Sequence, residues 1–115
     1  MFDFQKLSVY QKAKTINQAI ITLLAENDFD RHVKDQLKRA SFSIMLNIAE
    51  GSSRFSNKDR RYFMIIARGS AFECVAIFDF LKDSSMVSSE QYDLFTSKYE
   101  EISKMLYSLI RKLEK

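Results

Sequence analysis

The sequence SIMLNIAEGSSRFSNKDRRYF, residues 43–63, contains the pattern on which the fold assignment depends. An apolar run that carries one asparagine and one glutamate reaches Gly51 and then gives way to a short polar stretch rich in arginine and lysine. Glycine adopts the left-handed conformation at a helix C-terminus at little cost, so we expect Gly51 to end a helix. Ser56 or Asn57 can cap the start of the next helix. The stretch therefore predicts two helices joined by a short basic turn.

Helical periodicity extends outward from this turn over most of the chain. Apolar residues recur at steps of three and four in four segments, from about residue 7 to 26, 31 to 50, 56 to 82, and 88 to the C-terminus. The chain has no proline and only two glycines, which favours long uninterrupted helices. No strand pattern competes. The sequence therefore predicts an all-α, up-down-up-down antiparallel four-helix bundle that forms one domain over residues 1–115.

The two central segments carry more apolar surface than one core can cover. The segment from 56 to 82 has apolar residues on almost every side, and the segment from 31 to 50 has two apolar stripes. A monomer of this size would leave a large apolar patch in water. We therefore expect a homo-oligomer whose interface uses these two helices. Gly69 lies in mid-helix, where glycine costs roughly 1 kcal/mol relative to alanine, and close approach of another helix would explain it.

Several polar residues interrupt these apolar faces. Asn47 and Glu50 lie on a narrow polar seam of the second segment, while Ser70 and Glu73 lie on the third. A glutamate on an apolar face is costly to bury alone, so Glu73 should have a partner. The candidate partners are Asn47, Arg39 and Ser70. The four polar residues form either a ligand site in the bundle or an interhelical hydrogen-bond network that fixes helix register.

The residues that most enzymes and metal sites require are scarce. The chain has one histidine, His32, and one cysteine, Cys74, which lies in an apolar segment, so neither a Ser-His-Asp nor a Cys-His site is supplied. No Glu-x-x-His pair and no glycine-rich phosphate loop occurs. We therefore expect a non-enzymatic protein with no catalytic residue, no metal site and no cofactor. A buried lone thiol, no signal pattern and no apolar run of roughly 18 residues predict a cytoplasmic protein that does not cross a membrane.

Positive charge is concentrated around the basic turn. The net charge of +3 and a pI near 9.0 permit a polyanionic partner without requiring one. Phe55 and Tyr62 lie among the cations and can stack on bases if they are exposed. The simpler interpretation is a charged surface that keeps an oligomer soluble, but a ring of subunits would repeat the cluster into a sizeable positive field. The candidate nucleic-acid-binding residues are Lys38, Arg39, Arg54, Lys58, Arg60, Arg61 and Arg68.

Four motifs together resemble a known family. Residues 4–13 carry Phe-x-x-Leu-x-Val-Tyr-x-x-Ala, and residues 36–40 carry Gln-Leu-x-Arg-Ala. Residues 43–51 carry Ser-Ile-x-x-Asn-Ile-Ala-Glu-Gly, and residues 70–73 carry Ser-x-x-Glu. In this combination the chain resembles the four-helix-bundle proteins encoded by intervening sequences within bacterial 23S rRNA genes. The first loop departs from the family pattern, because it has Asp-Phe-Asp where members often have a Phe-Pro pair.

The resemblance implies a left-handed bundle that assembles as a homopentamer. The family includes the accessory variability determinant of diversity-generating retroelements, which binds nucleic acid and a reverse transcriptase through a basic surface. With the charge pattern, this leads us to expect an oligomer that binds RNA or RNA–DNA. The alternative is a protein-interaction scaffold or accessory subunit, for example of a reverse transcriptase, whose basic surface binds an acidic protein partner.

Overall fold

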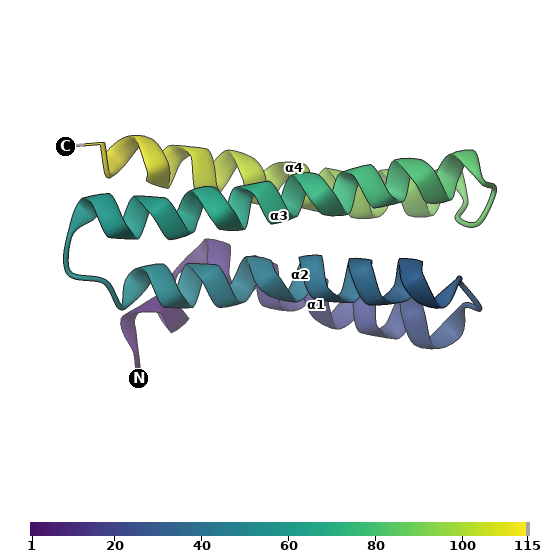
Figure 1. Cartoon of the computed structure of the whole chain (residues 1–115), viewed down its shortest axis with the longest axis horizontal. Helices are drawn as coiled ribbons and strands as arrows, with labels where there is room; N and C mark the ends of the chain where they lie inside the picture. The colour runs from purple at the N-terminus through teal and green to yellow at the C-terminus, as the bar shows by residue number, and fades with distance from the viewer. Residues whose placement is uncertain (115) are drawn as a thin grey trace.

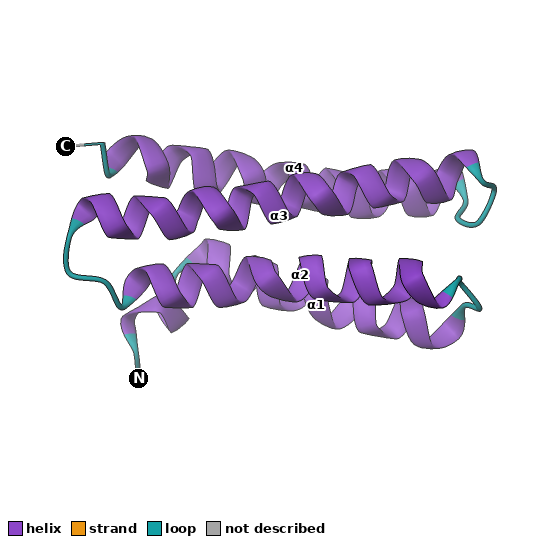
Figure 2. Cartoon of the chain, in the orientation of Figure 1, coloured by secondary structure: helices purple, strands orange, loops and turns teal. Residues whose placement is uncertain are grey.

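Four helices lie side by side and antiparallel along a molecule that measures 44 × 25 × 21 Å (Figure 1). The computed structural model describes residues 1–114. Within them the chain is all helix and loop, with no strand, which confirms the predicted fold class (Figure 2). The elements are a short 3-10 helix η1 (Asp3–Lys6), α1 (Ser8–Glu26), α2 (Arg31–Ser52), α3 (Asn57–Asp83) and α4 (Ser89–Lys112).

The order of the helices is up-down-up-down. Figure 1 shows α1 and α2 as one pair and α3 and α4 as the other. The α2–α3 loop lies at the same end of the bundle as the N-terminus, and the α1–α2 and α3–α4 loops lie at the opposite end. Each helix packs on the next in sequence, and α1 also packs on α4, which closes the bundle. None of the helices described is long and apolar enough to span a membrane.

All four helices contribute to a shared core. Their buried residues recur at the steps of three and four that the sequence pattern indicates, and Ile20, Ile44 and Phe78 are among the largest fully buried side chains. Tyr99 is also fully buried, and its hydroxyl shares a hydrogen bond of 2.9 Å with the hydroxyl of Ser41. The core therefore holds a polar pair whose members satisfy each other across two helices.

Burial makes Cys74 a poor nucleophile. The pKa of its thiol is raised from 9.0 to about 12, mainly by desolvation; a hydrogen bond with Tyr99 opposes the increase, and the negative charge of Glu73 contributes to it. Because the thiolate is the reactive form, the raised pKa leaves very little reactive thiolate at neutral pH. We expect a thiol-specific disulfide reagent to leave the folded protein unmodified for hours and to react at once in denaturant. Rapid reaction of the native protein would mean that Cys74 is accessible.

Gly51 does not end α2 in the predicted way. The helix continues to Ser52, and no glycine in the described residues has a positive φ. Gly51 is instead buried against the start of α3. A Cβ at this position would lie 2.8 Å from Met64 Cε, 2.9 Å from Phe63 Cβ and 3.2 Å from the carbonyl oxygen of Arg60. The missing side chain therefore allows α2 and α3 to approach each other closely beside their connecting loop.

Substitution of Gly51→Ala is expected to destabilise the fold by about 1–3 kcal/mol, as overpacking of a well-packed site does. The loss should outweigh the higher helix propensity of alanine, because one of the atoms in the way belongs to the backbone of Arg60. Urea unfolding, followed by circular dichroism, measures the change in the free energy of unfolding. The neighbouring Ser52→Ala substitution adds no atom and serves as the control. Equal stability of Gly51→Ala and the wild type would contradict the close approach.

Gly69 has the opposite environment. A Cβ built at Gly69 meets no heavy atom within 4 Å, and the residue lies on the outer side of α3. The close helix approach expected at this glycine is therefore not made by any helix of the same chain in residues 1–114. Its cost to the helix has no explanation within one subunit.

Candidate nucleic-acid interface

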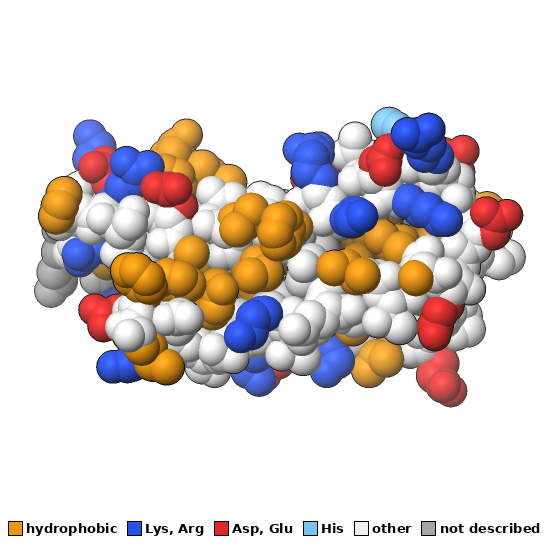
Figure 3. Space-filling model, turned by 90° about the horizontal axis from the view of Figure 1, so that it is seen from below, with side chains coloured by type: hydrophobic (Ala, Val, Ile, Leu, Met, Phe, Trp, Pro, Cys, Tyr) orange, Lys and Arg blue, Asp and Glu red, His pale blue; other side chains and the backbone are white. Residues whose placement is uncertain are grey.

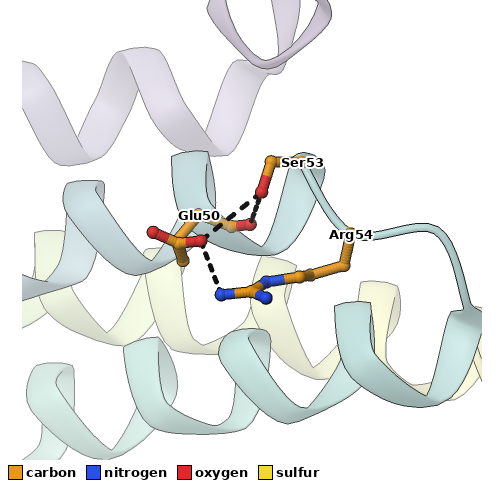
Figure 4. Close-up of polar contacts among 3 residues, drawn as sticks. All are labelled: Glu50, Ser53 and Arg54. Atoms are coloured by element: carbon orange, nitrogen blue, oxygen red, sulfur yellow. Dashed lines mark hydrogen bonds and ion pairs between the residues drawn. The ribbon is translucent and has the colours of Figure 1, made fainter.

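The α2–α3 loop, residues 53–56, is fixed to the end of α2 by an ion pair. Arg54 Nη2 donates to Glu50 Oε2 at 2.7 Å, and the Ser53 hydroxyl donates to the carbonyl oxygen of Glu50 at 2.7 Å (Figure 4). The guanidinium carbon of Arg54 also lies 4.6 Å from the centre of the Phe63 ring on α3. Because Phe63 belongs to α3 and Glu50 to α2, Arg54 links the two helices on either side of the loop.

The start of α3 fixes the other side of the loop. Arg60 Nε donates to the carbonyl oxygen of Arg54 at 2.7 Å. Ser56 caps the helix, because its hydroxyl accepts from the backbone N–H of Asp59 at 3.1 Å. The sequence left the cap open between Ser56 and Asn57, and the structure assigns it to Ser56. The loop therefore has a defined shape before any ligand binds.

Four of the seven candidate cations lie together at this end of the bundle, and we call Arg54, Lys58, Arg60 and Arg61 the basic end. Arg54 and Arg60 already have partners within the chain. Lys58 and Arg61 have no acidic side chain within ion-pair distance in residues 1–114. Arg54 and Arg60 thus shape the loop, but only Arg54 is neutralised by an acid, while Lys58 and Arg61 have neither an acidic partner nor a contact with the loop among the interactions of residues 1–114.

Lys38 and Arg39 lie far from the basic end. Arg39 precedes the end of α2 by 13 residues, about 20 Å along a helix. Its Nη2 lies 3.8 Å from Glu73 Oε2 and donates to Gln36 Oε1 at 2.9 Å, while Lys38 is exposed. The structure therefore does not unite these two residues with the loop in one patch on a single subunit.

Arg68 lies on the α4 side of α3, in a row of cations and aromatic rings. Its guanidinium carbon lies 4.6 Å from the Phe72 ring centre and 5.6 Å from the Tyr107 ring centre. Arg111 Nη1 donates to the Tyr107 hydroxyl at 3.1 Å. Tyr107 and Arg111 are not among the residues expected from the sequence. Their spacing of four residues, outside the apolar stripe of α4, was the signal that could have indicated them.

Two of the four predicted network residues meet between α2 and α3. The Ser70 hydroxyl donates to the Ser43 hydroxyl at 3.0 Å, and Asn47 Nδ2 donates to the same Ser43 oxygen at 2.9 Å. Asn47 Nδ2 also donates to the backbone carbonyl of Ser43 at 2.8 Å. This group joins the two helices through uncharged side chains, as a hydrogen-bond network between helices does.

The two carboxylates lie outside that group. Glu50 pairs with Arg54 at the loop, and the side chain of Glu73 is 43% exposed beside Arg39. Pairs this exposed contribute about 0–1 kcal/mol, so neither glutamate is a costly buried charge. In the part of the chain that the structure describes, no three His, Cys, Asp or Glu side chains are grouped as metal ligands would be.

An exposed apolar stripe runs along the outer side of α3. Its members follow one another at steps of three and four, as residues on one helix face do. Figure 3 shows hydrophobic side chains gathered on the side formed by α1 and α2 as well, so apolar surface is not confined to one helix. The α3 stripe consists of Tyr62, Ile65, Gly69, Phe72, Ala76 and Phe80, all of them exposed.

Comparisons with known proteins cover nearly the whole bundle. Residues 5–108 match the family model described as 23S rRNA-intervening sequence protein. A crystal structure of a protein of unknown function from the S23 ribosomal protein family of Bacteroides thetaiotaomicron is similar in fold, with a TM-score of 0.82 and 26% sequence identity. That similarity covers 89% of this chain and 97% of the other. No match was found among curated proteins.

Proposed function

The chain belongs to the family of 23S rRNA-intervening sequence proteins, and on that premise we propose that it is a non-enzymatic, oligomeric four-helix bundle that binds RNA, or an RNA–DNA hybrid, through its basic end. We place it in the cytoplasm, where a lone thiol such as Cys74 stays reduced. The proposal has two parts, a ligand and an assembly, and each rests on its own observation.

The proposal that the ligand is RNA rests on the position of the cations at the start of α3. Lys58, Arg60 and Arg61 are three of the first five residues of the helix. Positive side chains near a helix N-terminus oppose the helix dipole, at a cost of about 0.3–1 kcal/mol each. Arg60 offsets this cost by holding the loop, but no such contact explains the placement of Lys58 and Arg61. Phosphate groups would neutralise the charge and release counterions, which is the main source of affinity for nucleic acid.

The proposal of an oligomer is inferred from Gly69 and from the exposed apolar stripe of α3 that contains it. A mid-helix glycine costs about 1 kcal/mol, and a Cβ built at Gly69 meets no side chain or other element of residues 1–114 within 4 Å. A helix of a second copy, packed against the stripe at Gly69, would use that space and cover Tyr62, Ile65 and Phe72. We therefore propose the α3 stripe as the subunit interface, with five copies as the number that the family resemblance implies. Assembly would repeat the basic end around an axis and strengthen its field.

A gel shift with a structured RNA at low and moderate salt tests the ligand. Retardation is expected at about 50 mM salt and should weaken by orders of magnitude at about 200 mM, because each phosphate contact adds to the salt dependence. No retardation at the lower salt would end the proposal. Capture of an acidic protein that survives nuclease treatment would instead assign the basic end to a protein partner, such as a reverse transcriptase.

A further inference from the structure

Phe55, in the middle of the α2–α3 loop, is held almost entirely in water. The residue is 99% exposed, whereas the exposed aromatic residues of the α3 stripe, Tyr62, Phe72 and Phe80, are between 55% and 60% exposed. Burial of a phenylalanine side chain is worth about 1.5–3 kcal/mol, and Phe55 gains almost none of it in the single subunit.

The exposure of Phe55 is imposed by its neighbours in the chain. Arg54, the residue before it, is held by Glu50 at 2.7 Å through its side chain and by Arg60 at 2.7 Å through its carbonyl oxygen. Ser56, the residue after it, caps α3, and its own carbonyl oxygen accepts from the backbone N–H of Arg60 at 3.0 Å. With both neighbours fixed, the backbone presents the Phe55 ring to solvent, so an incoming ligand would not have to order the loop.

The charges around Phe55 indicate which kind of surface this ring fits. Lys58 and Arg61 follow it within six residues and have no acidic partner in residues 1–114. Of the nearby acids, Glu50 is paired with Arg54, and Asp59 lies in the first turn of α3 among three cations, so the local charge stays positive. An exposed ring next to free cations is complementary to a polyanion that carries flat, apolar faces. Single-stranded nucleic acid has both features, because its bases can stack on an aromatic side chain while its phosphates meet the cations.

We propose that Phe55 stacks on an unpaired nucleobase, so that the ligand of the basic end is single-stranded or looped RNA rather than a continuous duplex. The inference rests on the proposed function and adds the class of RNA to it. In a duplex, both faces of each base are covered by neighbouring base pairs, and Phe55 would have no face to contact. In a loop, bulge or single strand, the base can turn outward onto the ring while Lys58 and Arg61 contact the flanking phosphates.

Replacement of Phe55→Trp provides a direct test, because the chain contains no tryptophan and the new residue would be its sole source of tryptophan emission. The probes are a short oligoadenylate, the same strand annealed to oligouridylate, and inorganic polyphosphate, which has charge but no bases. Stacking predicts strong quenching by the single strand over the concentration range in which fluorescence anisotropy of the labelled RNA shows binding. Little quenching is expected with the duplex, and none with polyphosphate.

Affinity measurements on three further variants separate stacking from general apolar contact. Phe55→Tyr keeps a ring and should bind the single strand as the wild type does. Phe55→Leu keeps an apolar side chain without a ring, and Phe55→Ala removes both. These two should lose about tenfold or more in affinity for the single strand, in the range seen when a stacking residue is removed, with unchanged binding of polyphosphate. Wild-type affinity of Phe55→Leu would overturn the stacking.

The remaining outcomes distinguish this inference from the proposed function. Binding of RNA without quenching, together with wild-type affinity of Phe55→Ala, would overturn the stacking and leave the basic end as an RNA-binding surface. No binding of any RNA at low salt would contradict both the stacking of Phe55 and the proposed binding of RNA by the basic end. A shift of tryptophan emission to shorter wavelength with rising protein concentration, in the absence of RNA, would show that position 55 is buried against another subunit, which also overturns the stacking.

Discussion

Reversal of the charges of Lys58 and Arg61 together, to glutamate, is expected to weaken RNA binding on the order of 10- to 100-fold at about 50 mM salt. Neither cation has an acidic partner in residues 1–114, and unlike Arg60 neither donates a hydrogen bond to the loop, so their charge is available to phosphates. Both side chains lie on the first two turns of α3, where glutamate is favoured by the helix dipole, so the fold should be retained. Fluorescence anisotropy of a labelled RNA gives the affinities.

The matched control is the double variant Arg31→Glu with Lys98→Glu. Each reversal removes one positive charge and adds one negative charge, so both double variants change the formal net charge per subunit from +3 to −1. Arg31 and Lys98 are exposed, and Arg31 begins α2 at the end of the bundle opposite the basic end. The control should lose much less affinity. Equal losses in the two variants would mean that overall charge, and not the basic end, governs binding.

Substitution of Gly69→Gln is expected to convert the proposed oligomer into folded monomers of 13.5 kDa. In a single subunit the new side chain has free space and improves helix propensity by up to about 1 kcal/mol, so the bundle should remain helical. In the oligomer it would occupy the space proposed for a helix of the next copy and separate the apolar stripes. Static light scattering gives the mass, and circular dichroism confirms the helix content.

Ala19→Gln supplies the control for this substitution. Ala19 is a small, exposed residue in the middle of α1, away from the α3 stripe. The oligomer should persist in that variant. A Gly69→Gln protein that keeps the mass of the wild type would exclude the stripe as the interface, because a glutamine side chain does not fit between closely packed helices.

The helices themselves follow from local sequence signals. The observed start of α2 at Arg31 and the ends of α1 and α3 lie within one residue of the positions that periodicity predicts, because these segments have strong amphipathic patterns and no internal proline. The starts of α3 and α4 could also be predicted from the sequence. Ser56 and Ser88 provide side-chain caps, and such caps depend only on residues within one turn.

The partners of individual side chains depended on tertiary geometry and could not be predicted in the same way. Gly51 was expected to end α2 by a backbone conformation, yet it serves the packing of α2 on α3, which no local pattern reveals. Arg54 and Arg60 belong to the charge pattern, but only their contacts show that they shape the loop. Arg68 belongs to the same pattern and lies against α4, because its direction around α3 points it to Tyr107.

Native mass spectrometry of the wild-type protein with an excess of a single-stranded RNA at low ionic strength observes assembly and ligand together. We expect a species that contains several protein copies, five by the family resemblance, with RNA bound, and we expect RNA-free oligomer to return as salt is raised. A protein that remains a 13.5 kDa monomer and carries no RNA under these conditions would contradict both the interface on α3 and the role of the basic end.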